Sequence, residues 1–187
     1  RDWPPARWRT AASAVGVWSA DPDRHHVLVW FAVAALVGVA LVFDSPSMDH
    51  RFVVLGAVLP VVEGLVGGPW ILHTPILGVA LLAAVMLGAR GRRLTQRRWL
   101  GVPIGMLAHL VLDATWADTG IFWWPFAGVD TLGSPPVPEF GRGWGGVILE
   151  LLGLVLGAWA WRRFGLADPV RRTEFVRRGR LEAVRGR

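Results

Sequence analysis

This sequence predicts an all-α fold of the polytopic membrane type, a bundle of about five transmembrane helices. Of its 187 residues, 53% are hydrophobic and only 18% are charged, and the charges gather between long apolar runs. Its 12 tryptophans, with no tyrosine, often sit at the edges of those runs, where indole rings favour the lipid headgroup region. A chain that crosses lipid has to satisfy its backbone hydrogen bonds internally, so the runs are expected to be helices.

The apolar runs give the expected element order. The spans are Val27–Phe43, Phe52–Val66, Ile71–Leu87, Trp99–Trp116 and Trp144–Trp161. At ~1.5 Å per residue the second run is too short to cross ~30 Å of hydrocarbon upright, so we expect it to be short, tilted or re-entrant. Residues 1–26 are expected to form an interfacial amphipathic segment, residues 27–162 the bundle, and residues 163–187 a basic cytoplasmic tail.

Arginine sets the expected orientation. All 20 basic residues are arginines, which is typical of a GC-rich bacterial genome. The loop Ala89–Arg98 and the tail after Trp161 are arginine-rich and should be cytoplasmic, whereas Asp118–Gly143 should lie outside. We therefore expect a multi-pass protein of the bacterial plasma (inner) membrane. Its N-terminus lies outside if all the runs cross, and inside if the second run is re-entrant.

Composition also bounds the partners. The isoelectric point near 11.5 comes from arginines that flank apolar spans, which favours contact with anionic membrane lipids. The sequence carries no nucleic-acid recognition motif, so no nucleic-acid partner is expected. Because cysteine is absent, any metal ion would have to be held by histidine, aspartate or glutamate.

Ionisable side chains from separate runs fall at one depth, in the predicted outer half of the bilayer. They are Glu63, His73, His109, Asp113 and Glu150. A charge at that depth is costly unless it is paired or hydrated, so such residues face the bundle interior and commonly mark function. Their convergence from four helices is the strongest functional signal in the sequence.

Small residues share helix faces with these polar groups, and small residues let membrane helices approach closely. The pairs are Gly101 and Gly105 with His109 and Asp113, Gly153 and Gly157 with Glu150, Gly56 and Pro60 with Glu63, and Ala80 and Ala84 with His73. We expect all of these faces to pack inward.

The spacing of His109 and Asp113 puts an imidazole one turn from a carboxylate. Such a pair either binds a cation or makes a structural hydrogen bond, and His73 and Glu63 at the same depth favour the metal site. Glu150 is expected to be a supporting or structural partner more than a ligand. Other polar residues beside the first two spans are expected to be solvated helix ends. They are His25, His26, Asp49 and His50.

Over residues 26–126 the chain resembles the membrane-bound metal-dependent hydrolases, a family also described as LexA-binding and inner-membrane-associated. Its members carry P-D-x-D-H at the end of a leucine-rich helix, T-H-S at the head of the next, then G-x-x-x-H-x-x-x-D and a Trp-Pro loop. The matching positions here are Leu59 to Gly64, His73-Thr74, Gly105 with His109 and Asp113, and Trp124-Pro125, with His26 at the family's early histidine.

The chain departs from the family pattern at two of these motifs. Val61 stands at the first family aspartate and Gly64 at the histidine, and the residues before His73 lack the usual arginine and threonine. At least two ligands of the family are therefore missing. A site built for two metals in the family is expected to hold one here, or none.

These observations give a metal-dependent membrane hydrolase as the first hypothesis. Glu63, His73, His109 and Asp113 would hold a divalent ion, with Zn²⁺ suiting mixed nitrogen and oxygen ligands best. Glu150 or Asp118 would act as the base, and the substrate would be an amphiphilic or lipid-like molecule at the outer face.

Two alternatives stay open. The missing ligands favour a catalytically degenerate structural or regulatory subunit that binds a membrane protein partner. A small transporter is a third interpretation, because intramembrane acids and imidazoles also mark ion paths. The shared layer of the polar residues, without a route across, weakens that third interpretation.

Overall fold

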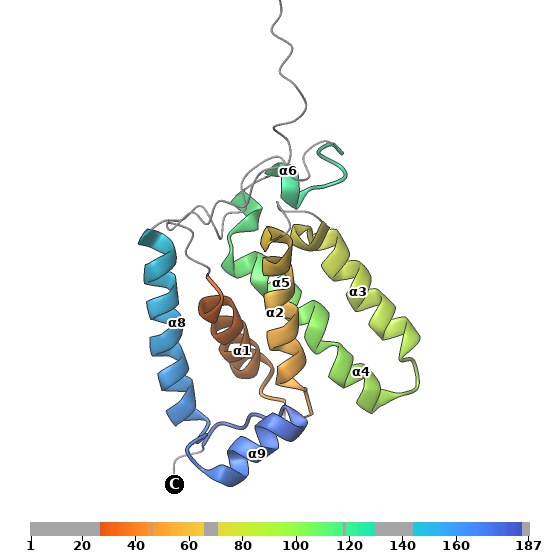
Figure 1. The fold of residues 1–187 in the computed structure, drawn as a ribbon. Helices are drawn as coiled ribbons and strands as arrows, with labels where there is room; N and C mark the ends of the chain where they lie inside the picture. The colour runs from red at the N-terminus through yellow and green to blue at the C-terminus, as the bar shows by residue number, and fades with distance from the viewer. Residues whose placement is uncertain (1–26, 46, 66–70, 118, 130–143, 185–187) are drawn as a thin grey trace, which may run out of the picture.

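The computed structural model describes residues 27–45, 47–65, 71–117, 119–129 and 144–184, and these residues are helical with short connections. Figure 1 shows the arrangement. The elements are α1 (Val29–Phe43), α2 (His50–Leu65), the 3₁₀ turn η2 (Ile71–His73), α3 (Pro75–Gly88), α4 (Arg93–Trp99), α5 (Gly101–Leu112), the 3₁₀ turn η3 (Thr115–Ala117), α6 (Thr119–Phe122), α8 (Trp144–Arg163) and α9 (Pro169–Arg178).

The predicted all-α class is confirmed, since the described residues contain no strand. Among them, only α8, with 20 residues, has the length and apolar composition of a membrane span, and α1 and α3 are apolar but shorter. The number of spans therefore stays a prediction. The run predicted at Trp99–Trp116 ends earlier than expected, because α5 stops at Leu112 and a 3₁₀ turn follows.

Helices α2 and α5 run side by side in the same direction, with their backbones in contact at glycines. A Cβ atom on Gly56 would lie 2.0 Å from the Val102 carbonyl oxygen, and one on Gly105 would lie 2.0 Å from the Val53 carbonyl oxygen. No larger residue fits at either position without separating the helices. The predicted inward-facing ridge on α5 is confirmed, because Gly101, Gly105, His109 and Asp113 are all buried.

Helix α8 packs against α1, and Gly153 is the close-contact residue there. A Cβ atom on Gly153 would lie 2.7 Å from the backbone nitrogen of Trp30. The prediction for α3 is wrong, since Ala80 and Ala84 are exposed. Instead Gly78 faces α5, where its Cβ would lie 2.6 Å from Leu107 Cδ2.

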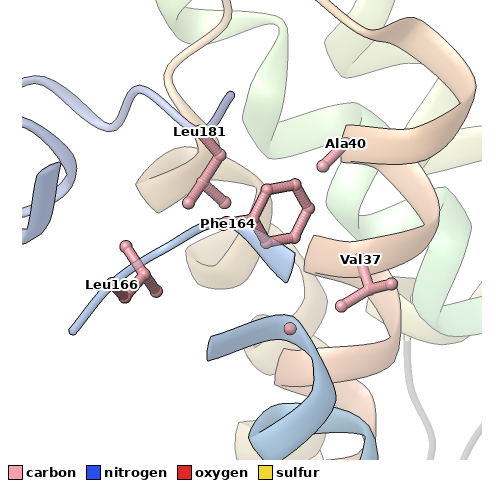
Figure 2. Close-up of a cluster of buried hydrophobic side chains, with 6 residues drawn as sticks. Val37, Ala40, Phe164, Leu166 and Leu181 are labelled. Carbon is pink, nitrogen blue, oxygen red and sulfur yellow. The ribbon is translucent and has the colours of Figure 1, made fainter. Parts of the chain in front are cut away.

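The chain after α8 folds back onto the bundle. Phe164, Leu166 and Leu181 are buried against Val37 and Ala40 of α1, together with Ala160. Figure 2 shows the Phe164 ring between Leu181 and the α1 side chains. The basic segment predicted as a tail thus contains a helix, α9, and apolar residues that anchor it to α1.

The bundle has two chemically different ends, visible at the bottom and the top of Figure 1. The arginine end comprises α4, α9 and the α1–α2 connection. The site end comprises the C-terminal turns of α2 and α5 with η2. The prediction that Asp49 and His50 are solvated is wrong, because both are buried at the arginine end. They are covered by the returning C-terminal segment, whose Gly179 carbonyl accepts a hydrogen bond from the backbone N–H of His50 at 2.9 Å.

Candidate metal centre

His109 is held in place by the close contact of α2 and α5. Because Gly105 touches the Val53 carbonyl, the next turn of α5 brings His109 against the next turn of α2. There His109 Nδ1 donates to the Ala57 carbonyl oxygen at 2.8 Å. Donation from Nδ1 puts the lone pair of the neutral imidazole on Nε2, the atom that can bind a metal. The Phe31 ring lies 4.2 Å from the His109 ring, centroid to centroid, and closes the apolar side.

His73 is oriented by a carboxylate. Its Nδ1 lies 2.9 Å from Glu63 Oε2, and the other oxygen, Oε1, accepts from the backbone N–H of Leu72 at 2.7 Å. Donation from Nδ1 to the carboxylate again leaves Nε2 as the metal-binding nitrogen. A carboxylate behind a ligating histidine fixes the ring and raises its basicity, as in many zinc sites.

Asp113 ends α5 and is supported from the following turn. Its backbone N–H donates to the His109 carbonyl at 2.8 Å, and its Oδ2 accepts from Thr115 Oγ1 at 3.2 Å. Between them Ala114 has φ of 58°, a left-handed conformation that costs a residue with a Cβ about 1–2 kcal/mol. The chain therefore makes a sharp, strained turn directly after the carboxylate.

The three side chains form one buried group. One ligand atom from each of His73, His109 and Asp113 lies within 4.8 Å of the other two. The ligands of one tetrahedral zinc ion lie ~3.4 Å apart, so the three side chains would have to draw slightly closer together to hold one ion. The exposed fractions are 1% for His73, 0% for His109 and 2% for Asp113. Two imidazoles and one carboxylate fit the zinc sites that keep a fourth position for water.

The other predicted site residues lie elsewhere or play a different part. Glu63, predicted as a ligand, contacts His73 and Leu72, and lies outside the group of three. Glu150, predicted as a base, accepts from the backbone N–H of Val29, at 2.9 Å to Oε1 and 3.1 Å to Oε2, and from that of Leu28. It therefore satisfies the first turn of α1. Asp118 and His26 lie outside the described residues.

Three groups that contact the site residues are not predicted from the sequence. The Ala57 carbonyl and the Phe31 ring carry no sequence signal, because any residue offers a carbonyl and Phe31 lies in a uniformly apolar run. Thr115 could have been found, since a threonine two residues after an aspartate is well placed to donate to it.

Trp124, which the resemblance places in the family's loop, is joined to Pro125 by a cis peptide bond. Comparison of the chain with protein-family models, with curated proteins and with solved structures finds no match.

Proposed function

We propose that this chain is a multi-pass membrane protein with a mononuclear metal site, and that it hydrolyses an amphiphilic substrate at the outer face of the membrane. The observation that carries the proposal is the buried group His73, His109 and Asp113, contributed by η2 and the end of α5, with a second carboxylate behind His73. The resemblance to the membrane-bound metal-dependent hydrolases gives the reaction class.

Exposed apolar side chains support the membrane placement. They cover the outward faces of several helices, and an exposed apolar surface of this extent marks contact with lipid or with another apolar partner. On α8 alone they include Ile148, Leu151, Leu152, Leu154 and Val155, and on α3 they include Val79, Met86 and Leu87.

The arrangement of the helices supports five crossings. Helix α2 is one continuous helix from the arginine end to the site end, with Pro60 inside it, which disfavours a re-entrant loop. Five helices then alternate in direction: α1, α2, α3, α5 and α8. Because arginine-rich segments stay in the cytoplasm, the arginine end faces the cytoplasm and the start of α1 lies outside. The metal site falls on the outer side, within reach of lipid headgroups.

The residues of the site would divide the work as follows. His73, His109 and Asp113 hold a divalent ion, with Zn²⁺ favoured by the donor set. When bound, such an ion lowers the pKa of a coordinated water towards ~7 and polarises the scissile group. Glu63 orients His73, and Thr115 orients Asp113. Because both oxygens of Glu150 accept from the start of α1, the proposal gives Glu150 no part in proton transfer.

One observation favours the alternative, a structural or regulatory subunit without activity. All three side chains are at most 2% exposed. A fully buried network of hydrogen bonds fixes helix packing even when it binds no ligand. In that case His73, His109 and Asp113 would hold α2, α5 and η2 in register, and the protein would serve a membrane protein partner.

Metal analysis of the detergent-purified protein separates the two. The hydrolase proposal predicts about one equivalent of zinc after purification without chelator, and less than about a tenth of that in His109→Ala and Asp113→Asn. A matched control is His50→Ala, which removes another buried histidine bonded to a carbonyl, at the arginine end. His50→Ala should keep the full equivalent. Absence of any stoichiometric divalent metal from the wild-type protein, even after reloading, would overturn the hydrolase proposal and favour the structural alternative.

A further inference from the structure

We infer that the groove between α3 and α4 binds one anionic phospholipid, with an acyl chain along α3 and the phosphate at the arginines beside α4. The inference rests on the membrane placement proposed above and is independent of the metal site.

The groove is a largely apolar trough at the arginine end, with a volume of about 310 Å³. Its lining includes Leu81, Ala84, Val85 and Gly88 of α3, with Arg92 and Trp99 at the α4 side. Gln96 Nε2 lies 2.9 Å from Met86 Sδ and ties the two helices together. Nothing lies within 4 Å of a Cβ atom built on Gly88, so the trough is open there.

The charge around the groove fits an anionic ligand. The stretch from Ala89 to Arg98 has no acidic residue. Arg98 is paired with Asp49 at 3.6 Å and Arg97 with Ser47 at 2.7 Å. In the part of the chain that the structure describes, no carboxylate lies within ion-pair distance of the remaining three, which are all exposed: Arg90, Arg92 and Arg93.

The groove and the charge together identify the ligand class. Apolar walls fit an acyl chain, and the unneutralised guanidinium of Arg92 in the lining fits a phosphate, which arginine binds with two parallel hydrogen bonds. Arg90 and Arg93 are its neighbours in the sequence and add positive charge to the same turn. Trp99, half exposed in the lining of the same groove, has the amphipathic ring that favours the headgroup level. A neutral lipid would fill the trough but leave the arginines unpaired.

The test measures binding of phosphatidylglycerol and of phosphatidylcholine with the same acyl chains to the full protein in a neutral detergent, by native mass spectrometry. We expect one saturable phosphatidylglycerol site and much weaker phosphatidylcholine binding. Arg92→Gln with Arg93→Gln should weaken phosphatidylglycerol about 25-fold, because each arginine near an anionic lipid contributes a factor of about five. The control pair Arg172→Gln with Arg177→Gln, exposed on α9, should not change it.

A second variant fills the groove without changing charge. Gly88→Leu should abolish the saturable site, whereas Gly38→Leu, at an exposed glycine of α1 with equally open surroundings, should leave it intact. Equal binding of the two lipids would reveal ordinary annular lipid and overturn the inference. So would unchanged binding in Gly88→Leu, or equal affinity for glycerol phosphate without acyl chains. None of these results bears on metal content or membrane topology, which are measured separately.

Discussion

Each end of the bundle contains a buried histidine and a carboxylate, but the two pairs have different partners. At each end a buried histidine donates from Nδ1 to a backbone carbonyl: His109 to Ala57 at 2.8 Å and His50 to Gly179 at 2.9 Å. At the site end the carboxylate of Glu63 contacts an imidazole and a backbone N–H. At the arginine end the carboxylate of Asp49 is bound by the Arg51 guanidinium, through Nε at 2.9 Å and Nη2 at 2.7 Å.

The partner of the carboxylate decides what each end can do. A guanidinium remains charged at every physiological pH and neutralises Asp49 permanently. Arg51 also donates from Nη1 to the Val176 carbonyl at 2.7 Å, so the Asp49–Arg51 pair locks the start of α2 to the C-terminal segment. Imidazoles instead present lone pairs, and with Asp113 they make a set of donors that suits a metal ion. A buried histidine that donates to a backbone carbonyl is therefore not a metal site by itself. The groups around its other ring nitrogen determine its role.

The largest expected difference between the ends is their side of the membrane. Because the chain has no cysteine, single cysteines can be introduced without background. Phe126→Cys near the site end and Leu94→Cys on α4 replace side chains that are both 83% exposed. A membrane-impermeant maleimide should label Phe126→Cys in intact cells, and Leu94→Cys only after permeabilisation. Labelling of both from one side would contradict the five-span arrangement.

The next effect concerns the lock at the arginine end. Gly179 has φ of 67°, and a Cβ there would lie 1.8 Å from Asp49 Oδ1. Gly179→Ala should therefore destabilise the docked C-terminal segment by about 2–4 kcal/mol, from the left-handed conformation and from the clash. Hydrogen exchange of residues 180–184 measures it.

Gly91→Ala is the matched control for that variant. Gly91 has φ of 83° but nothing within 4 Å of its Cβ position. Gly91→Ala is therefore destabilised only by the left-handed conformation, by about 1–2 kcal/mol. Zinc content should be unchanged in both variants. If Gly179→Ala exchanged no faster than wild type, the Asp49–Gly179 contact would not hold the segment.

A smaller effect tests the role of Glu63 at the site end. Glu63→Gln keeps an oxygen for the Leu72 N–H but removes the anionic acceptor behind His73, so zinc affinity should fall about 10- to 100-fold. Competition with a chromophoric chelator measures it. Glu150→Gln changes a carboxylate at the same end that contacts only the α1 backbone in the described contacts, and should leave zinc affinity unchanged. A loss of zinc as complete as in His109→Ala would make Glu63 a ligand, as the sequence predicts.

The sequence predicts the site end better than the arginine end, for a physical reason. His109, Asp113 and their glycine ridge lie on one helix, where a spacing of four residues alone puts them on one face. The burial of Asp49 and His50 depends on Gly179, far along the chain, folding back over them, and no local pattern encodes that return. The prediction of the inward face of α3 was also wrong, because its small residues Ala80 and Ala84 lie on the exposed side. Alanine suits an exposed apolar surface as well as a helix contact, so its position alone does not identify the packed face.

The smallest effect is a pH dependence of the lock. His50 lies at the start of α2, before the predicted second span. Burial lowers its pKa below the ordinary 6.5, outweighing the Gly179 carbonyl and Asp49, which both raise the pKa. Protonation would also place an N–H at Nε2, a buried atom that has no hydrogen-bond partner in the described part of the structure. The charged form of His50 is therefore less favourable in the docked state than in the undocked state.

A lowered pKa in the docked state fixes the sign of the effect. The contribution of His50 to docking is fully present above pH 6.5, and it decreases as the pH falls towards the lowered pKa, because the undocked state then binds more protons. Hydrogen exchange of residues 180–184, corrected for the intrinsic rate, should accordingly show less protection at about pH 5.5 than at about pH 7.5. His50→Asn can still donate to the Gly179 carbonyl but does not titrate in this range, so its protection should vary less with pH. Protection that rose on acidification in the wild type would mean that Asp49, and not burial, dominates the environment of His50.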